Sequence, residues 1–227
     1  MNAHDHKGGL GRREALAAGA AGHGALVLGC RPASALRSAT TSSSCVLSPE
    51  MTEGPYWIDD DLTRRDITED VDGLPLILRL SVVRATTCRP IKGADVEIWH
   101  ASPEGEYSGF DGSSGSRYLR GHQRSDAAGR VRFDTVFPGW YRGRTPHIHL
   151  KVHVGGDEVH TGQLFMSEKL TRAAYRTRYY RARGQADTSH AEDMIYGDGG
   201  ARSTLRVRRR SGGRRGYVGR LELGVRT

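Results

Sequence analysis

The feature that most constrains the fold is a series of short segments in which every second residue is hydrophobic. The clearest is LPLILRLSVV, residues 74–83, where four leucines and a valine alternate with other residues. Since successive side chains of a strand point to opposite faces, this period of two predicts strands with one buried face. Turns rich in Gly, Pro and Asp separate the segments, which indicates a β-sandwich or a β-barrel. The other predicted strands are 94–101, 129–139, 147–154, 158–166, 203–208 and 216–225.

One later segment has a helical pattern instead. Residues 167–183, SEKLTRAAYRTRYYRAR, contain Ala173 and Ala174, and alanine favours the helix most strongly of all residues. Ser167 can cap this helix, because a serine hydroxyl accepts a hydrogen bond from the N–H groups of the first turn. We therefore expect a mainly β fold with one short helix after the strands at 147–166.

Length and hydropathy limit the class of protein further. With 227 residues, the chain is long enough for one domain with a sizeable core. After the first thirty residues, no stretch is long and apolar enough to cross a bilayer. We therefore expect no transmembrane span.

The chain is basic, with a formal net charge of +8. Its arginines are concentrated in RSTLRVRRRSGGRRGYVGR, residues 202–220. Such a run can bind nucleic acid, or it can form a strand pair and hairpin whose charges are simply solvated. Neither a recognised nucleic-acid module nor interleaved aromatic residues accompany it. We favour the solvated hairpin and expect no nucleic-acid partner.

The N-terminal segment resembles an export signal. Arg12 and Arg13 precede an alanine- and glycine-rich apolar run, and paired arginines are typical of the twin-arginine route. We predict that residues 1–40 are a signal and a flexible Ser/Thr-rich linker, and that residues 41–227 form the folded domain outside the cytoplasm. The apolar run ends in VLGC, which is similar to a lipoprotein cleavage box, so a lipid anchor at Cys30 stays open.

Two cysteines remain once this segment is removed. They are Cys45 and Cys88. An even number of cysteines in a chain that we expect to be exported favours a disulfide between them. The alternative is two buried free thiols.

A group of polar residues in and near the predicted strand at 147–154 contains the candidates for a functional site. His147 and His149 lie two positions apart, so their side chains share one face of the strand. The simpler interpretation is a polar sheet face with solvated histidines; the functional one is two imidazoles that bind one metal ion. Tyr141 and Arg144 lie just before the histidines, and Tyr107 lies in an earlier loop. These neighbours favour the metal site.

Tyrosine as a ligand restricts the choice of metal. The phenol has a pKa of about 10 in water, so only a strongly acidic metal ion keeps it ionised at neutral pH. Fe(III) is hard and oxygen-seeking, and two phenolates with one hydroxide would balance its charge. Two neutral imidazoles would complete the site. This set differs from the two histidines and one carboxylate that suit Fe(II) oxygenases.

Four motifs in order resemble the intradiol ring-cleavage dioxygenases, a family that includes catechol, hydroxyquinol and protocatechuate dioxygenases. The motifs are TEGPYW at 52–57, GADVEIWHASPEGEYSGF at 93–110, GRVRFDTVFPGWYRGRTPHIHLKV at 129–152 and GQLFM at 162–166. The resemblance extends from about Cys45 to the C-terminus. It implies a β-sandwich core and a non-haem Fe(III) cofactor.

The resemblance also implies roles for individual residues. It implies four iron ligands, which are Tyr107, Tyr141, His147 and His149. Arg144 and Gln163 match the arginine and the glutamine of the family's active site. Tyr141 would leave the metal and take up a substrate proton, while Arg144 would stabilise negative charge on the substrate.

The implied reaction is cleavage of a catecholic ring between its two hydroxyl-bearing carbons. Both atoms of O2 would enter the product, a muconate-type dicarboxylic acid. Only RGRTP separates Tyr141 from His147, which resembles the exported, single-domain bacterial branch of the family. The identity of the catechol and the oligomeric state stay open.

Two alternatives remain at this point. The first is a metal-free β-sandwich binding module on the same scaffold, which iron content would distinguish. The second is a cupin-type Fe(II) or Zn(II) enzyme, which also uses two histidines in this spacing. Cupins place a glutamate a few residues after the second histidine. In this chain LKVHVG follows His149, and Glu158 lies too far along the sequence to match that glutamate.

Overall fold

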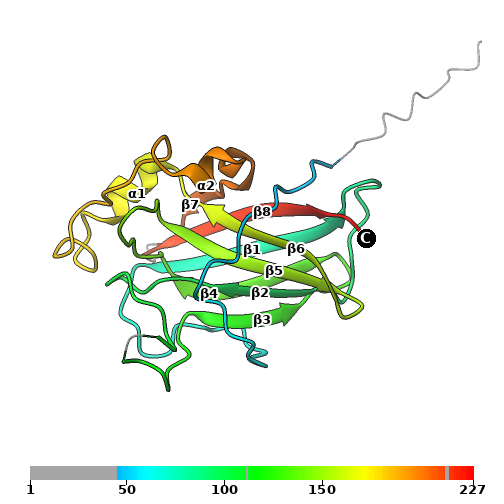
Figure 1. Cartoon of the computed structure of the whole chain (residues 1–227), viewed down its shortest axis with the longest axis horizontal. Coiled ribbons are helices and arrows are strands. Elements are labelled where there is room, and N and C mark those ends of the chain that lie inside the picture. The colour runs from blue at the N-terminus through cyan, green and yellow to red at the C-terminus, as the bar shows by residue number, and fades with distance from the viewer. Residues whose placement is uncertain (1–44, 111, 213–214) are drawn as a thin grey trace, which may run out of the picture. The chain divides into compact units, whose positions relative to one another are not determined.

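The computed structural model describes residues 45–110, 112–212 and 215–227 (Figure 1). The predicted signal, the linker and Cys30 lie outside the described residues. Within these ranges, no helix is long and apolar enough to cross a membrane.

Within the described ranges, eight strands form two sheets of four strands each. The first sheet has the order β4-β1-β8-β7, and the second has the order β3-β2-β5-β6. In the first sheet the bounds are β1 Pro75–Arg84, β4 Arg130–Val136, β7 Arg206–Arg209 and β8 Tyr217–Val225. In the second they are β2 Asp95–Trp99, β3 Arg120–Arg124, β5 His147–Val154 and β6 Asp157–Phe165.

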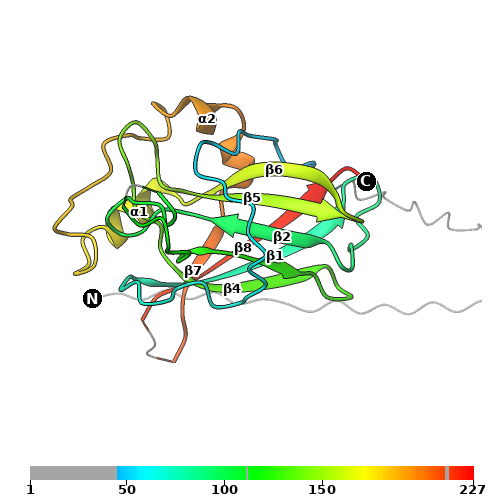
Figure 2. The same cartoon turned by 60° about the horizontal axis from the view of Figure 1, so that its bottom comes forward.

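The two sheets lie face to face as the layers of a sandwich (Figure 2). Leu76, Leu78 and Leu80 of β1 are at most 2% exposed and belong to one hydrophobic core. Ile148 and Leu150 of β5 belong to the same core from the opposite layer. The β-sandwich is therefore confirmed. All neighbouring strands are antiparallel except β1 and β8, which pair in parallel.

The alternating segments predict seven of the eight strands, although the strand predicted at 203–208 begins only at Arg206. Strand β3 is missed, because its sequence RGHQR has no hydrophobic alternation. Strand β3 is held instead by its pairing with β2, where Ile98 lies opposite Gly121.

The predicted helix is present but shorter than expected. Helix α1 spans Glu168–Ala174, and the Ser167 side chain accepts a hydrogen bond from the Leu170 N–H as the N-cap. The expectation that it continues to residue 183 is wrong. Tyr175 and Tyr180, each 1% exposed, turn into the core, and the Tyr175 hydroxyl donates to the Pro138 carbonyl at 3.0 Å.

Two short helical turns follow that the sequence did not predict. They are α2, Met194–Gly197, and the 3-10 turn η1, Gly200–Ser203. Asp193 is the N-cap of α2, where its side chain accepts hydrogen bonds from the N–H groups of Ile195 and Tyr196.

The predicted disulfide between Cys45 and Cys88 is confirmed. It joins residues 43 positions apart, whose Cα atoms lie 5.2 Å from each other. The start of the described chain is thereby linked to the loop after β1.

Candidate metal centre

Strand β5 carries the two histidines on the face opposite Ile148 and Leu150. His147 is 3% exposed and His149 is 1% exposed, so neither imidazole is solvated. The simpler interpretation, a solvated polar sheet face, is therefore wrong. Loops from other parts of the chain cover this face.

The covering loops bring the two predicted tyrosines to the histidines. Tyr107 lies in the loop between β2 and β3, and Tyr141 lies in the loop between β4 and β5. The Tyr141 Oη lies 3.1 Å from His147 Nε2, and His147 Nε2 lies 3.0 Å from His149 Nε2. The His149 Nε2 lies 3.1 Å from the Tyr107 Oη. Two phenol oxygens and two imidazole nitrogens therefore converge on one point.

The protonation of the histidines suits a cation at that point. His147 Nδ1 lies 2.7 Å from the Thr145 carbonyl oxygen, which can only accept, so Nδ1 carries the proton and Nε2 carries a lone pair. Burial, then the charge of Arg144, lowers the pKa of His147 to about 3. Burial, then His147, lowers the pKa of His149 well below its usual value. Both imidazoles are therefore neutral.

The two ring nitrogens of His149 have different surroundings. Its buried Nδ1 has no hydrogen-bond partner within the described residues. Its Nε2, in contrast, lies within hydrogen-bond distance of His147 Nε2 and of the Tyr107 hydroxyl. A cation bound by the Nε2 lone pairs of both histidines would separate these two neighbouring nitrogens, and the set of two imidazoles and two phenols fits a metal ion.

The phenols specify what kind of cation fits. Burial, then the neighbouring Tyr141, raises the pKa of Tyr107 well above its usual value, and burial also raises the pKa of Tyr141. Both phenols therefore need a strongly acidic metal ion to become ligands. Among the described residues, no group of three or more His, Cys, Asp and Glu side chains could hold a metal. A cupin-type site, which needs a carboxylate as well as histidines, is not formed here.

Aromatic side chains hold the donors in place. The Trp99 ring stacks on the His149 ring with centroids 5.0 Å apart, and the Tyr56 ring stacks on Tyr107 at 4.2 Å. Tyr56 belongs to the TEGPYW motif, in which Gly54 has a φ of +72°. A Cβ at Gly54 would lie 3.2 Å from a carbon of the His149 ring. This motif therefore packs against the donor group as well as forming a turn.

Arg144 and Gln163 lie beside the four donors. Gln163 is opposite His149 in the register of β5 and β6, which places both side chains on the same face. The Arg144 Nη2 donates to Gln163 Oε1 at 2.6 Å, and Gln163 Nε2 donates to the Thr52 carbonyl at 2.9 Å. The Arg144 Nη1 lies 3.5 Å from the Tyr141 Oη. All six predicted site residues are thus brought together.

The sequence did not identify Asp193 as part of this arrangement. Its side chain is 0% exposed, and its Oδ2 accepts from Arg144 Nε and from the Thr145 N–H, each at 2.9 Å. Its Oδ1 caps α2. The only sequence signal is that of an aspartate before a short helix, and this signal does not point to Arg144.

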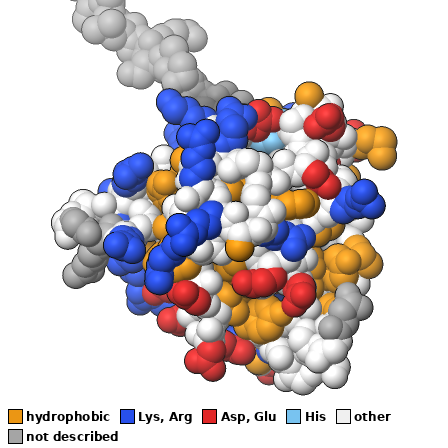
Figure 3. All heavy atoms as spheres, turned by 90° about the vertical axis from the view of Figure 1, so that its left-hand side faces the viewer, with side chains coloured by type: hydrophobic (Ala, Val, Ile, Leu, Met, Phe, Trp, Pro, Cys, Tyr) orange, Lys and Arg blue, Asp and Glu red, His pale blue; other side chains and the backbone are white. Residues whose placement is uncertain are grey.

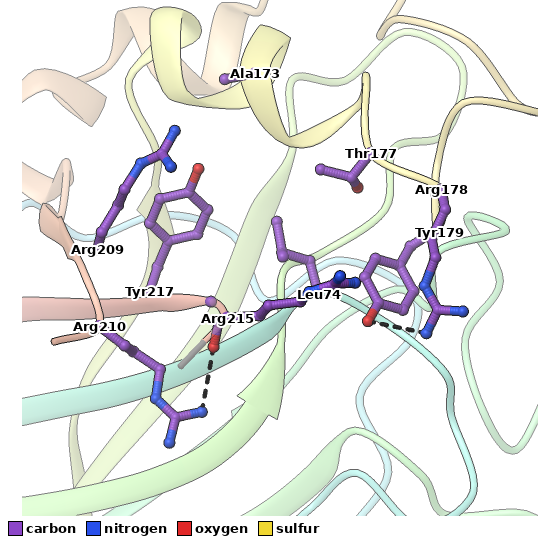
Figure 4. A pocket seen from close by; sticks show the side chains of 10 residues that line it. Leu74, Ala173, Thr177, Arg178, Tyr179, Arg209, Arg210, Arg215 and Tyr217 are labelled. Carbon is purple, nitrogen blue, oxygen red and sulfur yellow. Dashed lines mark hydrogen bonds between the residues drawn. The ribbon is translucent and has the colours of Figure 1, made fainter. Parts of the chain in front are cut away.

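A separate cavity of about 560 Å³ lies between α1 and the start of β8 (Figure 4). Leu74 and Tyr217 contribute apolar walls, and Arg178, Arg209 and Arg215 surround them. None of the four donor residues lines this cavity, so it is distinct from the candidate metal centre.

Comparison with known sequences agrees with the fold and the motifs. A family model described as Dioxygenase matches residues 46–169. A chlorocatechol 1,2-dioxygenase from Cupriavidus pinatubonensis is 29% identical over 133 residues, which are 50% of this chain and 52% of that protein. A catechol 1,2-dioxygenase from Acinetobacter lwoffii is 35% identical over 101 residues, covering 41% of this chain and 32% of that protein. The chain thus spans about half the length, or less, of these curated relatives.

Solved structures match over more of the chain. An intradiol ring-cleavage dioxygenase from Tetranychus urticae has a TM-score of 0.76 and 36% identity, covering 80% of this chain and 95% of that one. The dioxygenase domain of a carbohydrate-binding fusion protein from Streptomyces sp. SirexAA-E has a TM-score of 0.60 and 25% identity, covering 80% and 99%. Together with the matching motifs, these similarities show that the chain belongs to the intradiol dioxygenase family.

Proposed function

We propose that this protein is an Fe(III)-dependent dioxygenase that cleaves a catecholic ring between its two hydroxyl-bearing carbons. Both atoms of O2 enter the product, a muconate-type dicarboxylic acid. The observation that carries the proposal is the convergence of the phenols of Tyr107 and Tyr141 with the imidazoles of His147 and His149. The names of the relatives, catechol and chlorocatechol 1,2-dioxygenases, support a catecholic substrate.

These four side chains would hold the iron. When bound, Fe(III) supplies the Lewis acidity that keeps the phenols ionised and makes a catechol reactive toward O2. The neutral imidazoles and the two phenolates leave a small net charge at the centre, which suits a buried site. Trp99 below His149 and Tyr56 beside Tyr107 keep water away from the donors.

The two tyrosines have unequal surroundings, which supports unequal roles. Tyr107 is 4% exposed and lies under the Tyr56 ring, whereas Tyr141 is only partly buried. Tyr141 can therefore move with less rearrangement of its neighbours. We assign it the role of the base that takes up a proton from the catechol.

Arg144 is positioned to act on the substrate. Asp193 holds its Nε and Gln163 holds its Nη2, while Nη1 faces the Tyr141 oxygen. A guanidinium fixed in this way stabilises negative charge that develops on the substrate and needs no reorganisation during the reaction. Gln163, on β6, would orient the guanidinium through its hydrogen bond with Arg144 Nη2.

The test is to purify the protein and to measure iron per chain, the visible absorption of phenolate bound to Fe(III), and O2 uptake. The substrates would be catechol, hydroxyquinol, protocatechuate and larger lignin-like catechols. We expect a coloured protein with one iron per chain that yields a ring-opened dicarboxylate. A folded protein that takes up no iron would instead support the metal-free binding module.

We also propose that the protein acts outside the cytoplasm. The support is the arginine pair Arg12 and Arg13 before an apolar run, together with a disulfide in the described domain. Replacing both arginines by lysine should leave the protein in the cytoplasm, as cell fractionation would show. Unchanged export of that variant would contradict the twin-arginine route.

A further inference from the structure

The outward face of the first sheet is unusually basic. Side chains of β1, β4, β7 and β8 alternate between the core and the outside, as their burial patterns show. Two acidic residues, Asp134 and Glu222, face outward. The outward-facing arginines are Arg79, Arg130, Arg132, Arg206, Arg208 and Arg220.

Four of these arginines lie in a single row across the sheet. Arg132 of β4 is opposite Arg79 of β1. Arg79 is opposite Arg220 of β8, and Arg220 is opposite Arg206 of β7. We call Arg132, Arg79, Arg220 and Arg206 the arginine row. Neighbouring strands lie about 4.8 Å apart, and like charges directly opposite each other destabilise a sheet.

The protein neutralises little of this charge. Arg132 pairs with Asp134 at 2.7 Å, but Asp134 also pairs with Arg65 at 2.9 Å. Arg79, Arg206 and Arg220 make no ion pair and no side-chain hydrogen bond with any residue that the structure describes. Desolvation, then the charges of Arg220 and Arg132, lowers the pKa of Arg79. Three guanidinium groups are therefore free to bind an external anion.

Positive charge continues beyond the end of the sheet. Arg209, Arg210 and Arg215, at the ends of β7 and β8, line the cavity shown in Figure 4. The Arg210 Nη1 donates to the Arg215 carbonyl at 3.4 Å. Figure 3, which shows the side of the molecule where α1 lies, has a broad group of Lys and Arg side chains. Basic side chains thus also lie on the side of α1, outside the arginine row.

We propose that the arginine row binds an acidic polysaccharide. Arginine binds carboxylate groups with two parallel hydrogen bonds, and a polymer with a carboxylate on each sugar can contact successive arginines. Proteins that bind single-stranded nucleic acid combine basic grooves with aromatic side chains on which the bases stack. Within the described part of these four strands, no outward-facing residue is aromatic. A polyanion without bases fits this face better.

This inference does not depend on the proposed dioxygenase activity, because the row shares no residue with the candidate metal centre. It gives the arginine-rich hairpin a second role besides that of a solvated strand pair. An enzyme held on an acidic polymer would work where that polymer is deposited.

The experiment measures binding of the full chain to polygalacturonate by calorimetry at low salt and at increasing salt. Fully methyl-esterified polygalacturonate is the neutral control polymer, and single-stranded DNA is the competing polyanion. We expect binding to polygalacturonate that weakens steeply with salt. No binding to the methyl-esterified polymer is expected. Tighter binding to single-stranded DNA than to polygalacturonate, or no binding of the wild type, overturns the proposal.

Variants locate the binding site. Arg79→Gln combined with Arg220→Gln should weaken binding by about tenfold or more. The matched control is Arg89→Gln combined with Arg124→Gln, which removes the same charge from two exposed positions outside the row. The control should change affinity by less than about twofold, since no row contact is lost.

A change of opposite sign completes the test. Glu222→Gln removes an acidic side chain from the same face and should tighten binding. In all three variants O2 uptake should stay at the wild-type value and thermal stability should not fall below it, which separates loss of binding from loss of folding. An equal loss of affinity in the row variant and in its matched control would show that net charge alone governs binding and would overturn the proposal. No effect of Glu222→Gln would show that the polymer does not bind at this face, which overturns it as well.

Discussion

Single residues decide whether this site can hold iron, and the two tyrosines should not be equivalent. Tyr107 is enclosed under the Tyr56 ring, while Tyr141 borders Arg144 and is partly exposed. In the mechanism that we propose, the enclosed Tyr107 stays on the metal, whereas Tyr141 dissociates and also serves as a base.

We predict that Tyr141→Phe keeps part of its iron, shows a shifted visible band and loses much of its rate. Tyr107→Phe should lose more iron, because no other phenolate remains once Tyr141 has left. The measurements are iron per chain, visible spectrum and O2 uptake with catechol. Full colour and full iron in the double phenylalanine variant would show that the phenolate site is wrong.

Asp193 gives a second prediction at this scale. Its carboxylate accepts hydrogen bonds from Arg144 Nε and from the Thr145 N–H. The side-chain NH2 of an asparagine cannot accept these bonds and would place a third donor against the two N–H groups. We expect Asp193→Asn to keep its iron and its visible band while kcat falls by about tenfold or more.

Two comparisons separate positioning from general destabilisation. Arg144→Ala should also keep iron and lose about 10²–10³ in rate, since the guanidinium itself is removed. Asp198→Asn, an exposed aspartate at the other end of α2, is the control and should behave as wild type. If Asp193→Asn has wild-type kcat and KM, the carboxylate does not position Arg144.

At the scale of elements, the sequence predicts what lies within one strand and misses what joins distant segments. The period of two correctly placed His147 and His149 on one face of β5, because strand geometry alone determines it. The contact of Asp193 with Arg144 joins residues 49 positions apart, and no local pattern reports it. The sequence offered Tyr107 as a second tyrosine in an earlier loop, but only the resemblance to the family assigned it as a ligand, which periodicity could not have done.

Helix α1 shows the same limit. Its start was predicted, because Ser167 is a local cap. Its end was not predicted, because the burial of Tyr175 and Tyr180 in the core depends on β-strand residues far away in the sequence. Helix propensity is a weak signal that tertiary contacts override.

His100 connects the two sheets and makes stability depend on pH. It follows β2, and its Nε2 lies 2.8 Å from the Thr135 hydroxyl on β4. Burial lowers its pKa from 6.5 to about 4. As the pH falls, the unfolded chain therefore takes up the proton before the folded protein does. Protonation of this group lowers the stability between about pH 6.5 and about pH 4, and it causes no further loss below that range.

We predict that His100→Gln has lower stability at pH 7 but a smaller loss of stability between pH 7 and pH 4 than the wild type. Urea unfolding of both proteins at several pH values gives the two slopes. The contribution of His100 to the loss should be a few kcal/mol. Parallel curves for the two proteins would mean that His100 does not titrate in this range.

At the scale of the whole molecule, the disulfide links the start of the described chain to the loop after β1. A closed loop of 43 residues stabilises by about 4 kcal/mol in the chain-entropy account. We predict that Cys45→Ala combined with Cys88→Ala lowers the free energy of unfolding by roughly that amount while iron content stays unchanged. Urea unfolding measures the first quantity. Two reactive thiols in the denatured, unreduced wild type would contradict the bond itself.

The last prediction concerns residues 1–40, which we expect to be dispensable for folding and catalysis. From Cys45 onward the described chain is tied to the sandwich by its own contacts. Besides the disulfide, Leu47 pairs with Gly224 of β8, and the Ser48 N–H donates to the Gly224 carbonyl at 2.9 Å. These contacts all remain when the chain begins at residue 41. The shortened protein should therefore match the full chain in urea midpoint, iron per chain and O2 uptake with catechol. A shortened protein that unfolds at lower urea, or that loses iron, would show that the first forty residues contribute to the fold and would overturn the boundary that we place there.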